Sequence, residues 1–336
     1  MRALLSGILL LAGAWPLAAA KDLEIYSIDV EGGQATLLVS PSGQSLLIDA
    51  GWPGMNHRDA GRIAAAAKAA GVHKIDYLLI THYHTDHVGG VQGLAKRMPI
   101  LNFVDHGPQT ETGKDAEILF NEYVSFRDKG NHILAKPGET IPIKGIDVQV
   151  LSAAGNGIVA PLPDAGQPTP ECAGYPRPAA DRSENGQSVG VVITFGAFRM
   201  LDMGDLTKDR EYDLVCPNNK IGIVDLFLVS HHGSNLSNSL PFIHAIAPRV
   251  ALMNNGPQKG GDPEVWQTLR DTRGLLDLWQ LHYAVNSDKA HNSADAFIAN
   301  VDTICEAKWI KVTAEKNGTF TVVNSRDQFH KTYVKK

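Results

Sequence analysis

The chain has 336 residues, of which 43% are hydrophobic, and a formal net charge of −5. This is enough apolar material for a large buried core, and the length fits either two domains or one large α/β domain. No basic run is long enough to follow a nucleic-acid backbone, and the acidic balance disfavours tight binding of long nucleic acids.

The first twenty residues have the pattern of an export signal. Arg2 supplies a positive charge, residues 4–11 form a short apolar segment, and residues 18–20 are three alanines that resemble a cleavage site. The apolar segment is shorter than the roughly 20 residues needed to cross a bilayer, so a membrane anchor is the weaker alternative. We therefore expect an exported protein, periplasmic or secreted, with 21–336 as its mature chain and no stable membrane insertion.

The mature chain begins with strand-like segments and then alternates strands with helices. Residues 23–30 alternate roughly with a period of two. Strand-like segments at 35–39 and 45–48 follow, with a Pro-Ser-Gly turn between them, and the three predict an antiparallel meander. Further strands are expected at 75–80, 100–104 and as a pair within 141–151. Helices are expected at 59–70, 88–96 and 115–130.

The second half repeats this order of strands followed by helices. A hairpin is expected from 189–195 and 199–203. The strands expected after it are 225–229, 250–253, 278–281, 309–314 and 319–323, and the expected helices are 208–214, 240–246, 263–272 and 294–300. Two such halves predict an α/β sandwich of two mixed sheets packed face to face with helices outside, and we interpret 21–336 as one domain.

Residues 153–187 interrupt the alternation. This segment carries six prolines and little periodicity, and a loop of this length inside a compact domain is often functional. We interpret it as a flap over or beside the functional site, with an ordered surface excursion as the alternative.

The three cysteines are widely spaced and none forms a CxxC pair, which argues against a cysteine zinc site. In an oxidising compartment one disulfide and one remaining thiol are expected. We expect Cys172 to pair with Cys216, which leaves Cys305 as the thiol. Three unpaired cysteines are the alternative.

Four residues of metal-binding type lie within six positions, directly after the strand expected at 75–80. They are His82, His84, Asp86 and His87. In an extended segment residues two apart face the same side, so the first three would share a side and His87 would lie where the chain turns into a helix. Because imidazole and carboxylate groups bind zinc, manganese and iron, this spacing predicts a metal site.

This HxHxDH run after an apolar strand resembles the signature of the metallo-β-lactamase superfamily. The resemblance implies an αβ/βα sandwich that binds two divalent metal ions, zinc or alternatively manganese. It implies that His82 and His84 hold the first ion, and that Asp86 and His87 hold the second.

Two downstream segments extend the resemblance. Asp205, in a Met-Gly-Asp sequence, resembles the carboxylate that bridges the two metals. His231 and His232, in a His-His-Gly-Ser sequence, resemble the segment that supplies the last histidine ligand. We assign His232 to the metal and His231 to a substrate-facing acid, with the opposite assignment as the alternative.

Residues 28–35 and 184–189, together with the His-His-Gly-Ser run, are similar to the hydrolase domain of the DNA-uptake channel ComEC. Two features depart from the family pattern. Gln34 stands where an aspartate is usual, and no histidine follows the strand expected within 141–151 to complete the first metal's ligands. The second departure weakens a β-lactamase assignment. It leaves the first metal short of a ligand unless Asp105 or His106, at another strand end, completes the first site.

The resemblance implies phosphodiester or phosphate-ester hydrolysis by a metal-bound hydroxide. Asp86 would carry a proton, His231 would act as acid, and Asp49 would be structural or would support a metal-binding histidine. The acidic balance favours a small molecule or a head-group ester as substrate. The alternatives are β-lactamase- or lactonase-type hydrolysis of an amide, lactone or thioester, and a non-catalytic exported metal-binding protein.

Overall fold

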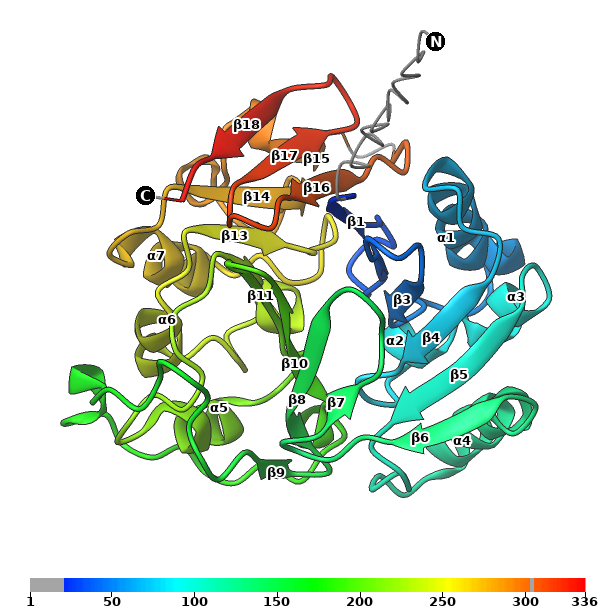
Figure 1. Ribbon diagram of the computed structural model, residues 1–336, viewed down its shortest axis with the longest axis horizontal. Helices are drawn as coiled ribbons and strands as arrows, with labels where there is room; N and C mark the ends of the chain where they lie inside the picture. Colours follow the sequence, from blue (N-terminus) through cyan, green and yellow to red (C-terminus); the bar gives the residue numbers. More distant parts are fainter. Residues whose placement is uncertain (1–20, 303–304, 336) are drawn as a thin grey trace, which may run out of the picture.

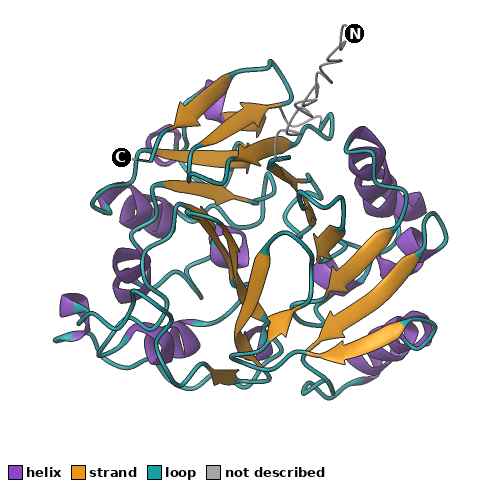
Figure 2. Cartoon of the chain, viewed as in Figure 1, coloured by secondary structure: helices purple, strands orange, loops and turns teal. Residues whose placement is uncertain are grey.

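The structure is a computed structural model that describes residues 21–302 and 305–335. The export signal predicted for residues 1–20 lies outside the described residues. Within them, two nine-stranded mixed sheets pack face to face (Figure 1). Helices lie on both outer sides of the sheets (Figure 2). The α/β sandwich predicted from the sequence is therefore confirmed.

The first sheet has an antiparallel half and a parallel half. Its order is β18-β17-β16-β1-β2-β3-β4-β5-β6, antiparallel from β18 to β3 and parallel from β3 to β6. The strands are β1 (Leu23–Ser27), β2 (Thr36–Val39), β3 (Ser45–Ile48), β4 (Ile75–Leu79), β5 (Ile100–Asp105), β6 (Asn131–Leu134), β16 (Ile310–Ala314), β17 (Phe320–Asn324) and β18 (His330–Tyr333). The helices between them are α1 (Arg58–Ala69), α2 (Thr85–Val88), α3 (Val91–Ala95) and α4 (Lys114–Arg127).

The second sheet has the order β15-β14-β13-β12-β11-β10-β8-β7, and β9 pairs with β8. Neighbours are parallel from β11 to β15 and antiparallel elsewhere. The strands are β7 (Thr140–Ile141), β8 (Asp147–Ala153), β9 (Asn156–Gly157), β10 (Gly190–Phe195), β11 (Phe198–Asp202), β12 (Leu226–Leu228), β13 (Val250–Met253), β14 (Asp277–His282) and β15 (Ile298–Asn300). The helices are α5 (Lys208–Val215), α6 (Leu240–Ile246) and α7 (Pro263–Asp271).

The core has three layers. Inward-facing residues of both sheets form one apolar cluster, with Leu46 and Leu79 on one side and Met200 and Leu228 on the other. Two more clusters lie beneath α1, α3 and α4 and beneath α5, α6 and α7, on the two outer sides that Figure 1 shows. Burying one aliphatic side chain is worth roughly 1.5–3 kcal/mol. A strand covered on both faces therefore has a nearly continuous apolar sequence, as β4 does.

Most predicted elements coincide with observed ones, but the helix expected at 294–300 is wrong. That segment forms a short 3₁₀ turn, Asp295–Phe297, followed by strand β15. Ile298 and Ala299 are buried, and β15 pairs with β14. The gain from completing the sheet outweighs the helix preference of an alanine-containing segment. The edge strands β6 and β18 were not predicted.

The helix expected at 88–96 is divided at Gly89 and Gly90 into α2 and α3. A Cβ atom at Gly90 would overlap the carbonyl oxygen of Ala50. The backbone therefore passes where only glycine fits. The Gly90 N–H donates to the Gly51 carbonyl at 2.9 Å and the His87 carbonyl accepts from the Ala50 N–H at 2.7 Å, so the helical hydrogen bonds are interrupted where α2 meets the end of β3.

The Pro-rich segment 153–187 contains short ordered elements, namely β9 and the 3₁₀ turns Pro170–Cys172 and Asn185–Gln187. The expected disulfide between Cys172 and Cys216 is confirmed, and it ties this segment to the end of α5. Cys305 is the free thiol. In the two described stretches of the chain, no helix is both long enough and apolar enough to cross a bilayer.

Candidate metal centre

The predicted ligands come from strand ends of both sheets. His82 and His84 follow β4, whereas Asp86 and His87 lie on α2. Asp205 follows β11, and His232 lies in the 3₁₀ turn Ser230–Gly233 after β12. The carboxyl ends of parallel strands carry the loops that build sites in α/β folds, and here two such edges face each other.

Four of these residues form a buried cluster. One ligand atom from each of Asp86, His87, Asp205 and His232 lies within 4.8 Å of the others. His232 Nε2 is 3.1 Å from Asp86 Oδ2, and His87 Nε2 is 3.2 Å from the same oxygen. His87 Nε2 is also 3.3 Å from Asp205 Oδ2 and 3.3 Å from His232 Nε2.

This arrangement fits a divalent cation. Two imidazole Nε2 atoms face each other, and lone pairs at that separation repel unless a proton or a metal ion lies between or beside them. Asp205 Oδ1 is buried and accepts no hydrogen bond from the described residues. Nitrogen and carboxylate donors of this kind are those that zinc and manganese take in proteins.

The electrostatics of the cluster also favour a cation. Burial alone would lower the pKa of His87, but the carboxylates of Asp205, Asp86 and Asp49 outweigh it and hold that pKa well above its usual value. Burial opposes ionisation of Asp86 and Asp205, yet His87 and His232 keep the pKa of both carboxyl groups well below the usual range. The cluster is therefore a site of concentrated negative charge that calls for positive charge.

His82 and His84 lie beside this cluster. His82 Nε2 is 3.1 Å from His84 Nδ1 and 3.9 Å from Asp205 Oδ2. Burial first, and then the neighbouring His87, hold the pKa of His82 well below its usual value, so its ring is neutral and able to bind a metal. His84 is partly exposed, and its Nε2 lies 3.1 Å from Glu111 Oε1.

The extended alternation expected for this run ends earlier than predicted. His82 and His84 face each other as the alternation requires, but Asp86 lies on α2 and not on an extended segment. The helical turn places Asp86 and His87 beside each other at the second half of the site.

Asp105 and His106, the two residues considered for completing the first half, do not reach the cluster. The Asp105 carboxylate accepts hydrogen bonds from the Tyr123 hydroxyl at 2.7 Å and the Gly107 N–H at 2.9 Å. His106 Nε2 is 2.9 Å from Glu184 Oε2. Both side chains are held by partners outside the cluster.

His231 lies at the edge of the cluster, where its Nε2 is 3.3 Å from Asp205 Oδ2 and its Nδ1 is 3.2 Å from Ser237 Oγ. Burial lowers its pKa despite the nearby Asp205 carboxylate. The backbone of His231 and of His232 has positive φ, 53° and 56°. Such conformations are costly for residues other than glycine and are often retained at functional sites.

Asp49 supports the cluster from behind. Its Oδ2 is 2.7 Å from His87 Nδ1, and its two oxygens also accept the Thr81 N–H at 2.8 Å and the Thr81 hydroxyl at 2.7 Å. A proton on Nδ1, held by Asp49, leaves the Nε2 lone pair of His87 free to face the other ligands. The supporting role considered for Asp49 thus matches its contacts.

Gln34, which departs from the family pattern, does not reach the cluster. Its side-chain N–H group donates to both oxygens of Asp202, at 3.1 and 3.0 Å, and Asn254 donates to its Oε1 at 3.3 Å. Burial raises the pKa of Asp202 to about 7. The Gln34 amide therefore pairs with the Asp202 carboxyl group, which an aspartate at position 34 would repel.

The sequence interpretation missed Lys259, whose ammonium group donates to Asp86 Oδ2. It lies in a Lys-Gly-Gly sequence after β13, at the same edge of the sheet as Asp205 and His232. A lysine beside glycines at a strand end was the available signal.

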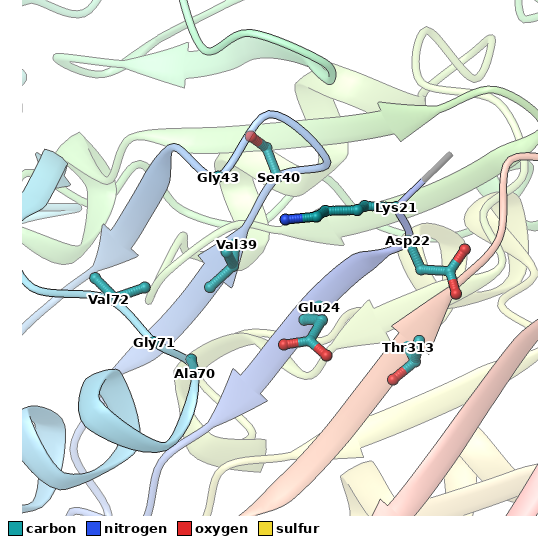
Figure 3. Close-up of a pocket in the computed structure, with 10 residues that line it drawn as sticks. All are labelled: Lys21, Asp22, Glu24, Val39, Ser40, Gly43, Ala70, Gly71, Val72 and Thr313. Carbon is teal, nitrogen blue, oxygen red and sulfur yellow. The ribbon is translucent and has the colours of Figure 1, made fainter. Parts of the chain in front are cut away.

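A cavity of about 420 Å³ opens beside His84. It is lined by Pro53, Tyr83, His84, Thr85, Glu111, Asp115, Ala116, Ile118, Leu119 and Glu122. Another cavity, of about 490 Å³, lies beside β1 and β2 near Lys21 and Glu24 (Figure 3), and its lining includes none of the predicted ligands. Of these two cavities, only the first is lined by a predicted ligand, His84.

Comparison with known proteins agrees with this site. Residues 28–171 match the family model of the metallo-beta-lactamase superfamily. ComE operon protein 3 from Bacillus subtilis (strain 168) is 29% identical over 191 residues, 56% of this chain and 21% of that protein. Competence protein ComA from Neisseria gonorrhoeae is 24% identical over 252 residues, 74% of this chain and 30% of that protein.

Among solved structures, the metallo-beta-lactamase fold protein YhfI from Bacillus subtilis aligns with a TM-score of 0.48 and 13% identity, over 77% of this chain and 96% of that one. The chain spans less than a third of the length of the two competence proteins.

The chain contains a metallo-β-lactamase superfamily domain, with the fold of that superfamily. It is a distant homologue of competence proteins of the ComEC type. Its buried His/Asp cluster is of the kind through which this superfamily, mostly metal-dependent hydrolases, binds metal.

Proposed function

We propose that this protein is an exported hydrolase that uses two divalent metal ions to cleave phosphodiester or phosphate-ester bonds of a small substrate. The observation that carries the proposal is the buried group of Asp86, His87, Asp205 and His232, whose ligand atoms converge. Zinc or manganese ions bound there and at His82 and His84 would supply an activated water and polarise the ester.

The residues of the chain have separate tasks in this proposal. Asp205 lies between the two halves and orients the reacting groups, and Asp86 accepts a proton as the water is consumed. His231 lies at the edge of the cluster, where it donates a hydrogen bond to a phosphoryl oxygen and passes a proton to the leaving group. Ser237 holds the far nitrogen of that ring, at 3.2 Å.

The choice of phosphate esters over amides rests on the resemblance of residues 28–35 and 184–189 to the ComEC-type hydrolase domain. The first half of the site also lacks the third histidine that β-lactamases have. That histidine would be expected at the end of β8, where this chain has Ser152. Ser152 Oγ instead donates to the carbonyl of Ser188 at 2.9 Å.

A small substrate is supported by the cavity beside His84. Three carboxylates line it, those of Glu111, Asp115 and Glu122, and its volume is that of a site for a small molecule. Acidic walls repel a long polyanion that would have to pass them. A nucleotide, a small diester or a phosphorylated head group fits better than a nucleic acid.

Export is supported by the signal-like pattern of residues 1–20 and by the disulfide between Cys172 and Cys216, since disulfides persist in oxidising compartments. Expression of the full chain in a bacterial host tests it. We expect the purified protein to come from the periplasm or the medium and to begin at Lys21 by mass spectrometry. Recovery of the uncleaved chain from the cytoplasm would contradict export.

The activity is tested with the purified protein loaded separately with zinc and manganese, assayed against bis(p-nitrophenyl) phosphate and against nitrocefin. Asp205→Ala is the test variant, and Asp76→Ala, which removes a buried aspartate of β4 outside the cluster, is the matched control. Metal content and folding of each variant are measured beside the rates.

We expect metal-dependent cleavage of the diester that a chelator abolishes, that Asp205→Ala loses and that Asp76→Ala keeps. Opening of nitrocefin without diester cleavage would overturn the proposal in favour of a β-lactamase-type hydrolase. If the protein binds metal tightly but hydrolyses neither the diester nor nitrocefin, and no other phosphate ester or lactone, it is a non-catalytic metal-binding protein.

A further inference from the structure

Lys259 is fixed at the metal centre by the loop that carries it. This loop follows β13 and is closed by a hydrogen bond from the Gly256 N–H to the Lys259 carbonyl, at 2.8 Å. The Gly261 N–H donates to the carbonyl of His232 at 2.9 Å. Gly260 has a positive φ of 71°, and a Cβ atom there would overlap that same carbonyl. The loop is therefore attached to the backbone of a predicted metal ligand.

The opposite side of the loop packs on the segment that precedes β2. A Cβ atom added to Gly32 would lie 2.8 Å from Lys259 Cβ and 3.1 Å from the Gly256 nitrogen, so glycine permits this close approach. The Lys259 side chain is thus held between the Gly32 segment and the His232 segment, with its ammonium group directed at the cluster.

The ammonium group has one buried partner and one open side. It donates to Asp86 Oδ2, and it lies 4.9 Å from the centre of the Trp52 ring, within cation–π range. The Lys259 side chain is 38% exposed, whereas that of Asp86 is 9% exposed. Since an ammonium group has three donors, donors remain available on the solvent side.

We propose that Lys259 binds the anionic oxygen of the ester substrate beside Asp86, through the solvent-exposed side of its ammonium group, while Asp86 and Trp52 keep that group at the metal centre. This inference rests on the proposed function and specifies it further. The substrate must carry negative charge beside the bond that is cut, which excludes neutral esters as preferred substrates.

The physical argument is one of charge. A metal ion bound to Asp86 shares the charge of that carboxylate, so the carboxylate holds the ammonium group less strongly. The N–H groups of the Lys259 ammonium can then bind an anionic oxygen of the substrate. The position is partly buried, so a charged hydrogen bond there is stronger than in water.

The test uses three variants of the full protein. Lys259→Met removes the charge and keeps the length, Lys259→Arg keeps the charge, and Lys96→Met removes an exposed lysine at the end of α3 as the matched control. Each variant is loaded with manganese, freed of excess metal and analysed for metal content. Binding of inorganic phosphate is measured by calorimetry. KM and kcat are measured for bis(p-nitrophenyl) phosphate and for neutral p-nitrophenyl acetate.

For Lys259→Met we expect phosphate binding and the KM for the diester to weaken by about 10- to 100-fold, the scale of one charged contact. Metal content and the KM for the neutral ester should change less than about twofold, and Lys259→Arg should recover most of the loss. Unchanged phosphate binding in Lys259→Met would overturn the inference. So would lost metal, or equal loss on both esters, because Lys259 would then act by positioning Asp86.

The two proposals fail separately. If the unaltered protein cleaves the diester and Lys259→Met matches it, the anion site is wrong and the phosphoesterase stands. If the unaltered protein cleaves neither ester but binds phosphate through Lys259, the anion site stands and the phosphoesterase does not. If the loaded protein binds no phosphate at all, the anion site is wrong.

Discussion

Replacing Asp49 by asparagine should weaken metal binding although Asp49 is not expected to touch the metal. Its carboxylate accepts from the Thr81 N–H and hydroxyl and lies 2.7 Å from His87 Nδ1. Asparagine keeps one acceptor oxygen, which the Thr81 N–H will take because that N–H is buried. The amide N–H group then faces His87 Nδ1.

The consequence is a change of tautomer. A ring nitrogen that accepts from an amide carries no proton, so the proton of neutral His87 moves to Nε2, the atom that faces Asp86, Asp205 and His232. A protonated Nε2 cannot bind a metal ion. Loss of such a supporting contact typically weakens metal binding by about 10- to 100-fold, which corresponds to about 1.4–2.7 kcal/mol.

The assay is competition with a chelator of known affinity, for zinc and manganese, with total metal determined on the same samples. Asp76→Asn serves as the control, because Asp76 is also buried and also accepts from backbone, the Ser45 N–H at 3.0 Å, but lies outside the cluster. The ion held by His82 and His84 should be affected less. If Asp49→Asn binds both ions as tightly as the unaltered protein, the reasoning that His87 binds through Nε2 is refuted.

Three further predictions concern stability and reactivity. The bond between Cys172 and Cys216 closes a loop with a sequence separation of 44, so replacing both by serine should lower the free energy of unfolding by about 4 kcal/mol. Coinciding urea unfolding curves for the variant and the unaltered protein would contradict this. Burial raises the pKa of Glu211 from 4.5 to about 7 although the Ser239 and Asn238 N–H groups oppose it. The bound proton therefore stabilises the fold at pH 4, and this contribution, of about 3 kcal/mol, is lost as the pH rises through 7. The free energy of unfolding of Glu211→Gln should not show that loss between pH 5 and 8. If the unfolding free energies of the variant and the unaltered protein change in parallel with pH, the raised pKa of Glu211 is excluded. Burial and the Asp29 carboxylate raise the pKa of Cys305 to about 12, so its thiol should react with a disulfide reagent at pH 8 at least about tenfold more slowly in the folded protein than in urea; equal rates would show that the thiol is accessible and ionised.

The parts of the fold that the sequence predicted are those that depend on local pattern. Strand β4 is recognisable because both faces are buried, and the run from His82 to His87 because its ligands are adjacent. Edge strands are different. Strand β6 has the sequence Asn-His-Ile-Leu and β18 His-Lys-Thr-Tyr, both mostly exposed, so neither has the alternation that marks a half-buried strand.

Contacts between segments that are distant in the sequence could not be predicted from local sequence patterns. Lys259 meets Asp86 across 173 positions, and His282 meets Asp29 across 253 positions. Spacing alone does not indicate such pairs. Asp205 and His232 were predicted only because their segments resemble a known family, and the structure then brings both to the same cluster.

The two halves of the site are unequal, and the reason lies outside it. Asp86, His87, Asp205 and His232 form a buried group with Asp49 behind it, whereas His82 lies beside that group, near Asp205 and His87, and His84 lies beyond His82. The two residues considered for completing the first half, Asp105 and His106, are engaged elsewhere. Glu184 binds His106 at 2.9 Å and accepts the Thr110 N–H at 2.6 Å, and Tyr123 binds Asp105. These buried contacts would have to break, leaving charged groups unpaired, before either could turn to the metal. Under the proposed function, an ion held by His82 and His84 would have an incomplete set of protein ligands, and a substrate oxygen or a water would complete it beside the acidic cavity.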